Sequence, residues 1–115
     1  MFFPESRARI WLCCQPTDMR KSFTGLSAQV KNQLSGDPLS GDLFVFINRR
    51  RTQMKVLYFD HSGYCIWSKK LEQGQFATGS STLNKRPLDW VGLKLLLEGI
   101  EIQKARQYKR FSYSG

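Results

Sequence analysis

Histidine is nearly absent from this chain of 115 residues, and acidic residues are few. The one histidine is His61, and nine Asp and Glu residues stand against eighteen Lys and Arg residues, for a formal net charge of +9. Enzymes need reactive side chains that converge on a substrate, and this composition offers few of them. The positive charge instead favours association with large anions such as nucleic acids or acidic proteins. We therefore expect a binding protein and no enzyme.

Cysteines are also few, and long apolar runs are missing. Cys13 and Cys14 are neighbours and Cys65 stands apart, so the three form neither a disulfide framework nor a zinc pattern. We expect all three to be reduced core residues, with no metal or cofactor bound. No segment approaches the length of a membrane span, and the opening residues lack the pattern of a signal peptide. The sequence thus predicts a cytoplasmic protein with no membrane partner.

The spacing of apolar residues predicts one small α+β domain over residues 1–100. Period-two alternation and short apolar runs predict strands near 8–14, 43–47, 54–59 and 64–71. Short turns join the later strands, which indicates an antiparallel meander. Both faces of the segment 43–47 are apolar, so we expect it inside the sheet or under a helix.

Two helices are predicted to pack on this sheet, near 18–34 and 89–98. The first would begin with Thr17 as a cap and Asp18 in the first turn, and it carries one apolar stripe. The second has Asp89 at the cap position and is apolar on nearly all sides, so it is either central to the fold or covered by a partner. For the second case the candidate partner-binding residues are Trp90, Leu93 and Leu97. The glycines and small polar residues of 72–81 predict a loop or irregular edge, and the sequence does not determine the conformation of residues 72–88.

Two sets of residues could suggest catalysis, but each has a simpler structural interpretation. Asp60, His61 and Ser62 are neighbours in a predicted turn, where their side chains cannot converge as a triad does. Asp18, Asp60 and Glu98 could form an acidic metal site, but each is expected to have a structural role at a turn or helix end. The glycines match no nucleotide-binding pattern.

The segment FINRRRTQMK places Arg49, Arg50 and Arg51 at the tip of a predicted hairpin. Guanidinium groups grip phosphate bidentately and stack on bases, so such a tip can contact nucleic acid. The alternative is a charged cap that keeps the hairpin soluble. The strongly basic composition favours contact with a polyanion.

Other basic residues extend this candidate surface. Alternation along a strand allows only one of Lys69 and Lys70 to share the face of Lys55. Residues 101–115 form a basic, aromatic tail that is expected to be flexible and that offers charge together with stacking faces. The full candidate nucleic-acid set is Arg49, Arg50, Arg51, Lys55, Arg20, Lys21, Lys69, Lys70, Lys109 and Arg110.

The order of motifs resembles a known family from about Arg9 to Ile100. The pieces RIWLCCQPTDMRKSFTGLSAQV, DPLSGDLFVFINRRRTQMKVLYFDHSGYCIWSKKLEQGQF and LLLEGI are similar to the TnpB accessory proteins, which the second open reading frame of IS66-type insertion sequences encodes. The segment TGSSTLNKRPLDWVGL departs from the usual threonine-proline start of the last helix.

The resemblance implies a bacterial accessory protein that acts beside a separate transposase, and it carries no catalytic residues over. Our first hypothesis is a non-enzymatic protein that binds DNA, the transposase, or both. The alternative is a protein-interaction module that makes no DNA contact. A metal-dependent nuclease comes last, and the sequence leaves open whether the chain forms a homo-oligomer.

Overall fold

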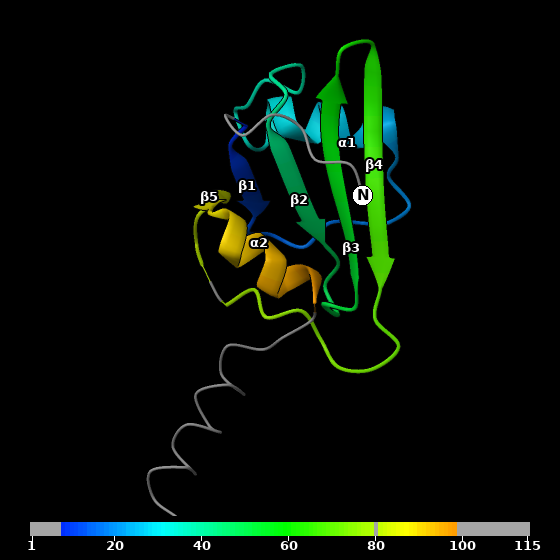
Figure 1. Cartoon of the computed structure of the whole chain (residues 1–115), viewed down its shortest axis with the longest axis vertical. Coiled ribbons are helices and arrows are strands. Elements are labelled where there is room, and N and C mark those ends of the chain that lie inside the picture. Colours follow the sequence, from blue (N-terminus) through cyan, green and yellow to red (C-terminus); the bar gives the residue numbers. More distant parts are fainter. Residues whose placement is uncertain (1–7, 80, 99–115) are drawn as a thin grey trace, which may run out of the picture.

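A computed structural model describes residues 8–79 and 81–98 of the chain. One five-stranded sheet forms the centre, and one helix packs against each of its faces (Figure 1). The strands are β1 (Ile10–Cys13), β2 (Leu43–Ile47), β3 (Gln53–Asp60), β4 (Gly63–Lys70) and β5 (Lys85–Leu88), and the helices are α1 (Phe23–Asn32) and α2 (Trp90–Leu97). The predicted α+β class is confirmed.

The order of strands across the sheet is β4-β3-β2-β1-β5. The antiparallel meander is confirmed for β2, β3 and β4, which are neighbours in both sequence and space. β1 departs from that pattern because it pairs with β2 in parallel, with Ile10 opposite Leu43. Parallel neighbours cannot be joined by a tight turn, and here the connection runs through α1. The meander is therefore extended by a β-α-β unit.

Strand β5 lies in a segment whose conformation the sequence left open. Its four residues, KRPL, show no apolar alternation, and Pro87 cannot donate to a ladder. The strand forms at the edge of the sheet, antiparallel to β1, where a proline can be accommodated. The ammonium of Lys85 lies 4.4 Å from the centre of the Trp11 ring, a cation–π contact that adds to the pairing.

Helix α1 begins later than predicted, at Phe23, with Ser22 as the residue before it. The predicted capping residues have other contacts: the Asp18 carboxylate accepts a hydrogen bond from the backbone amide of Arg20, at 2.9 Å. The Thr17 hydroxyl accepts one from the side-chain amide of Gln29, at 3.0 Å. The local bond between Asp18 and Arg20 competes with helical backbone bonds, so Met19 and Arg20 form a turn and the helix begins after it.

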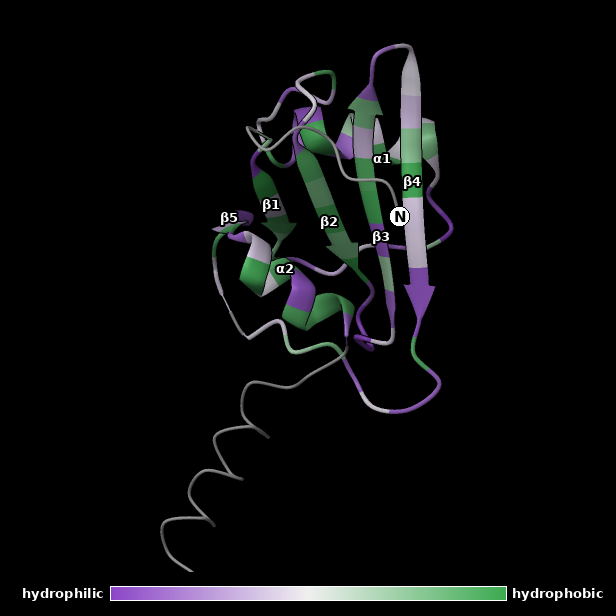
Figure 2. Ribbon diagram, viewed as in Figure 1, coloured by the Kyte–Doolittle hydropathy of each residue, from purple (hydrophilic) through white to green (hydrophobic). Residues whose placement is uncertain are grey.

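The core has two layers because successive residues of β2 point to opposite faces, and all five are buried. Phe44 and Phe46 pack with the apolar stripe of α1, while the other residues of β2 pack beneath α2. The colouring in Figure 2 shows the apolar residues gathered along β2 and the central part of β3. The expectation of a strand covered on both faces is confirmed.

All three cysteines are free, as the sequence predicted. Cys13 is buried, and Cys14 and Cys65 are half-buried. Burial, followed by the nearby Asp60 carboxylate, raises the pKa of the Cys65 thiol, which keeps it in the neutral form. Cys65 therefore behaves as a small, partly buried residue of β4 that packs against the core, opposite Tyr58 on β3.

A candidate nucleic-acid interface

The arginine turn, Arg49 to Arg51, connects β2 and β3 at one end of the sheet. The amide of Arg51 donates to the carbonyl of Asn48 at 3.0 Å, and the amide of Asn48 donates to the carbonyl of Gln53 at 3.1 Å. Arg51 adopts a left-handed backbone, with φ at 59°, which costs free energy in a residue other than glycine. Such a conformation persists only where surrounding contacts hold it.

Asn48 supplies the first of those contacts. Its side-chain Oδ1 accepts hydrogen bonds from the backbone amides of Thr52, at 2.9 Å, and Gln53, at 3.0 Å. Its Nδ2 donates to the hydroxyl of Thr52 at 3.2 Å. The connection contains no glycine, which tight hairpin turns commonly use. The Asn48 side chain instead stabilises this turn by accepting hydrogen bonds from backbone amides inside the loop. The sequence singled out the arginines that the turn presents and missed this residue's role in holding them.

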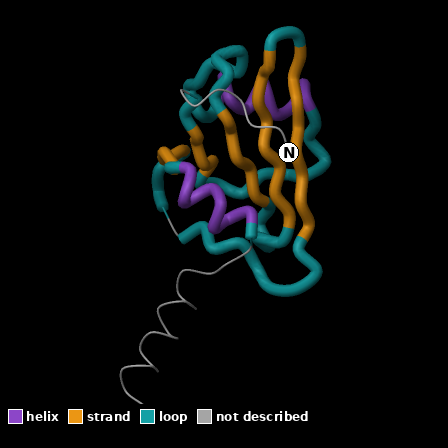
Figure 3. The backbone as a smooth tube through the Cα atoms, viewed as in Figure 1, coloured by secondary structure: helices purple, strands orange, loops and turns teal. Residues whose placement is uncertain are grey.

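The loop after β4 holds the arginine turn from its other side (Figure 3). The Gln75 side-chain amide donates to the carbonyl of Arg50 at 2.8 Å, and the Phe76 amide donates to the carbonyl of Arg51 at 2.7 Å. Phe76 is itself fully buried, which fixes this loop to the core. The backbone of the arginine turn is thus held by groups from two segments, while its own side chains remain exposed.

The charges of the arginine turn are not neutralised within the described part of the chain. The Arg51 guanidinium donates to the Gln75 amide oxygen at 3.3 Å, a neutral partner. Among residues 8–79 and 81–98, the ion pair that the structure contains is the one between Arg20 and Asp18. Three exposed guanidinium groups therefore lie together with no carboxylate bound to them, which produces a positive potential at this end of the sheet.

Arg20 differs from the other candidates because its charge is already paired. Its guanidinium contacts the Asp18 carboxylate, with 2.7 Å between Nη2 and Oδ2. The hydrogen bonds from Arg20 lower the pKa of Asp18 to about 2, and the same pairing raises the pKa of Arg20. An anion would have to displace this carboxylate, so Arg20 contributes little net charge to a binding surface.

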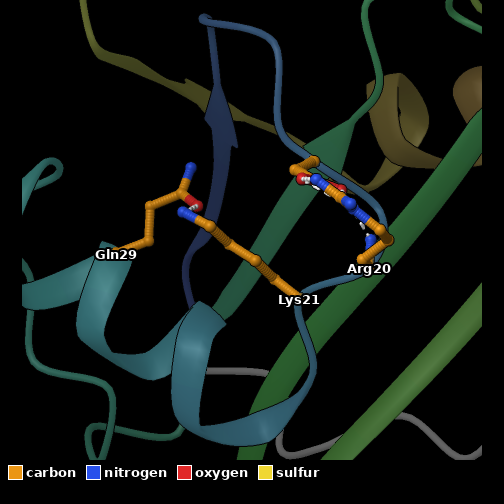
Figure 4. A network of polar contacts seen from close by, with 4 residues as sticks. Arg20, Lys21 and Gln29 are labelled. Atoms are coloured by element: carbon orange, nitrogen blue, oxygen red, sulfur yellow. Dashed lines mark hydrogen bonds and ion pairs between the residues drawn. The ribbon is translucent and has the colours of Figure 1, made fainter.

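Lys21 and Lys55 lie close together on the α1 face of the sheet. The Lys55 ammonium donates to the carbonyl of Lys21 at 2.8 Å, and the Lys21 ammonium donates to the Gln29 side chain at 3.1 Å. Figure 4 shows Lys21 reaching across to Gln29 on α1, with Arg20 beside it on the same loop. Neither lysine contacts a carboxylate among the described residues, so both charges remain available at this edge.

Lys69 and Lys70 point to opposite faces, as strand alternation requires. Lys70 pairs with Gln53 and Ser68 pairs with Lys55, so Lys70 shares the face of Lys55. Lys69 lies on the α2 face, where its ammonium donates to the carbonyl of Leu97 near the end of the helix. That contact places a cation at the negative end of the helix dipole, a structural role. Lys109 and Arg110 lie outside the described residues.

The candidate partner-binding residues on α2 are only partly exposed. Trp90 is 37% exposed and Leu97 is half-buried, but Leu93 is 1% exposed and belongs to the core. Asp89 caps the helix as predicted, because its Oδ1 accepts a hydrogen bond from the amide of Gly92 at 2.6 Å. Val91, which was not among the candidate partner-binding residues, is a more exposed apolar residue of α2, at 66%.

The residues considered for catalysis do not converge in the described structure. His61 and Ser62 form the exposed turn between β3 and β4, and Asp18 is occupied by Arg20. Within residues 8–79 and 81–98, no three His, Cys, Asp or Glu side chains lie close enough together to hold a metal ion. The helices of this same portion are too short or too polar to cross a bilayer.

Fold and site together define a small α+β protein in which hydrogen bonds hold the backbone of the arginine turn, and its guanidinium groups have no carboxylate partner among the described residues. The sequence matches the family described as "IS66 Orf2 like protein" over residues 8–107, and the chain belongs to this family of transposition accessory proteins. The chain is 36% identical over 93 residues to "Uncharacterized protein y4hO" of Sinorhizobium fredii (strain NBRC 101917 / NGR234), covering 81% of each chain. It is also 40% identical over 76 residues to "Uncharacterized protein y4jC" of the same strain, covering 66% of this chain and 65% of the relative. No solved structure matches the chain.

Proposed function

We propose that this accessory protein binds DNA during transposition, without catalysing a reaction itself, through the arginine turn together with Lys21, Lys55 and Lys70. The observation that carries the proposal is the arginine turn: its backbone is held by Asn48 and the Gln75 loop, and its guanidinium groups lack carboxylate partners in the described chain. Because DNA lies in the bacterial cytoplasm, we infer that the protein works there.

The proposed contact is with the phosphate backbone. A guanidinium group donates two parallel hydrogen bonds to a phosphate, and holding the turn in advance reduces the entropy lost on binding. Each phosphate that a cation neutralises releases condensed counterions, so affinity falls steeply as salt rises. Arg20 is paired with Asp18, so it is not part of the proposed DNA-binding surface. Leu93, a candidate for protein binding, is buried and is not part of any exposed surface.

The test is to change Arg49, Arg50 and Arg51 together to alanine and to measure duplex DNA binding at several salt concentrations. The logarithmic salt slope should flatten by about 0.9 for each phosphate that the variant no longer neutralises. A matched control removes three exposed charges from other elements, by changing Arg9, Lys31 and Lys94 to alanine. Equal weakening by both triple variants would show that only net charge matters, and would remove the arginine turn from the mechanism.

A second candidate function is docking of another protein of the element, such as the transposase, on α2. It is supported by the 66% exposure of Val91 beside the partly exposed Trp90, since exposed apolar patches commonly mark interaction sites. Val91→Glu should abolish co-purification with the transposase while DNA binding by the pure protein persists. Ala28→Glu, at an exposed position on α1, is the control for one added negative charge. Co-purification that survives Val91→Glu would refute this role.

A further inference from the structure

A pocket of about 270 Å³ opens beside the arginine turn, at the carboxyl ends of the parallel strands β1 and β2. Arg49 and Arg51 form part of its wall, together with Cys14, Thr78 and Ser81. Arg50 does not line it. Ligands of sheets with parallel strands commonly bind outside the carboxyl ends of those strands, because the chain diverges there and leaves a recess.

The lining of this pocket suits an anion. Its described residues include two arginines and several hydroxyl, thiol and amide groups, and no carboxylate is among them. The Arg51 guanidinium is oriented by the neutral Gln75 oxygen at 3.3 Å and keeps its charge. Two arginine side chains from the wall of a recess can donate to one phosphate from two directions. The Ser81 hydroxyl can act as a further donor, whereas the Thr78 hydroxyl donates to the carbonyl of Gly79.

The small size of the pocket bears on which phosphates can enter it. The backbone of an intact duplex is continuous and convex, so it can lie on the exposed arginine turn without entering a recess. A strand end can insert its terminal phosphate. The volume lies just below the roughly 300 Å³ at which ligand pockets for small molecules begin, which matches a single small group better than a larger ligand.

We propose that this pocket receives the terminal phosphate group of a DNA strand end, with Arg49 and Arg51 as its direct ligands. The inference rests on the proposed DNA binding and deepens it, because it assigns different roles to the three arginines of the turn. Arg50 contacts the outside of the duplex, and Arg49 and Arg51 face the recess.

The experiment measures affinity of the full chain for three labelled DNA probes of equal length. The first is a duplex with a 5′-phosphorylated single-stranded overhang, the second is the same duplex without the phosphate, and the third is a closed dumbbell that has no strand end. The protein should prefer the phosphorylated overhang to the dumbbell by about tenfold, the effect of one charge-assisted hydrogen bond to phosphate. The overhang without its phosphate should bind with intermediate affinity.

Two double variants with equal loss of charge separate the pocket from the outer surface. Changing Arg49 and Arg51 to glutamine should abolish the preference for the phosphorylated end. Changing Arg50 and Lys55 to glutamine should weaken binding of all three probes while the preference persists. Thr78→Phe, which fills the recess without altering charge, should also abolish the preference, and a circular dichroism melt of each variant confirms that it folds.

The binding measurements separate the pocket assignment from the proposed DNA binding. Binding of all three probes with equal affinity by the unchanged protein would overturn the pocket assignment and leave the proposed DNA binding standing. No binding of any probe would overturn both. In an NMR titration, the Cys14 and Thr78 amide signals should shift with the phosphorylated strand at far lower concentration than with inorganic phosphate. Equal response to inorganic phosphate alone would assign the pocket to a free anion and refute the strand end.

Discussion

Replacing Asn48 with alanine isolates the side chain that keeps the arginine turn in shape. In the variant the backbone amides of Thr52 and Gln53 lose their common acceptor, since both donate to Asn48 Oδ1. Removing each hydrogen bond has a net cost of about 0.5–1.5 kcal/mol, so the free energy of unfolding should fall by about 1–3 kcal/mol. For a domain of this size each kcal/mol lowers the melting temperature by about 4–8 °C.

Calorimetry or a thermal melt measures the loss of stability, and Asn48→Asp is the matched control. Aspartate keeps the oxygen that accepts from both backbone amides and removes only the donor to the Thr52 hydroxyl. It should therefore cost less stability than alanine. The two variants should differ from the unchanged protein in DNA binding as well, although all three arginines are present in each.

The alanine variant should bind DNA more weakly because the left-handed backbone of Arg51 is no longer held, so the cost of ordering the loop is transferred to the binding step. The aspartate variant should also bind more weakly, because it adds one negative charge beside the arginines. This account of the turn would be refuted by an alanine variant whose free energy of unfolding lies within about 0.5 kcal/mol of that of the unchanged protein and which binds DNA equally well.

Three further predictions concern the fold. Gly36→Ala should lower the free energy of unfolding by about 1–3 kcal/mol, since its new methyl group would lie within 3.2 Å of a Phe ring on β2, whereas Gly63→Ala meets nothing within 4 Å and should be far milder in the same melt. Asp89→Ala should cost about 1 kcal/mol by removing the cap of α2, and a variant with asparagine there should restore most of it. NMR titration should give Asp18 a pKa of about 2, and Arg20→Gln should return it toward 3.8. Because the pKa of Asp18 is lower in the folded state, this pair stabilises the fold fully above pH 4 and stops doing so as the pH falls through about 2. The free energy of unfolding of Arg20→Gln should therefore depend less on pH between those limits than that of the unchanged protein. The same pH dependence in both proteins would contradict the assignment.

The sequence predicted the strands of the meander because each carries its own periodic signal. β2 and β3 alternate large apolar residues, and short turns force consecutive strands to pair in antiparallel fashion. β5 has no such signal, since KRPL is a polar segment that becomes a strand only when the exposed edge of β1 is available to it. The parallel pairing of β1 likewise depends on α1 packing against the sheet, a contact between distant residues.

The candidate site divides in the same way. The run of arginines and the basic composition are visible in the letters of the sequence, and strand alternation predicts that Lys69 and Lys70 point to opposite faces. The sequence could not show that Asp18 neutralises Arg20, since this depends on the loop conformation. It could not show that the Gln75 loop returns to hold the arginine turn either.

The sequence alone determined which residues alternate, where the chain turns and how much positive charge the molecule carries, because these properties depend on near neighbours and on composition. The tertiary structure alone decided which cations keep their charge, which face each one occupies, and that a recess opens beside Arg49 and Arg51. Those properties arise where segments far apart in the chain meet, and the energies of such contacts depend on distances that no local pattern encodes.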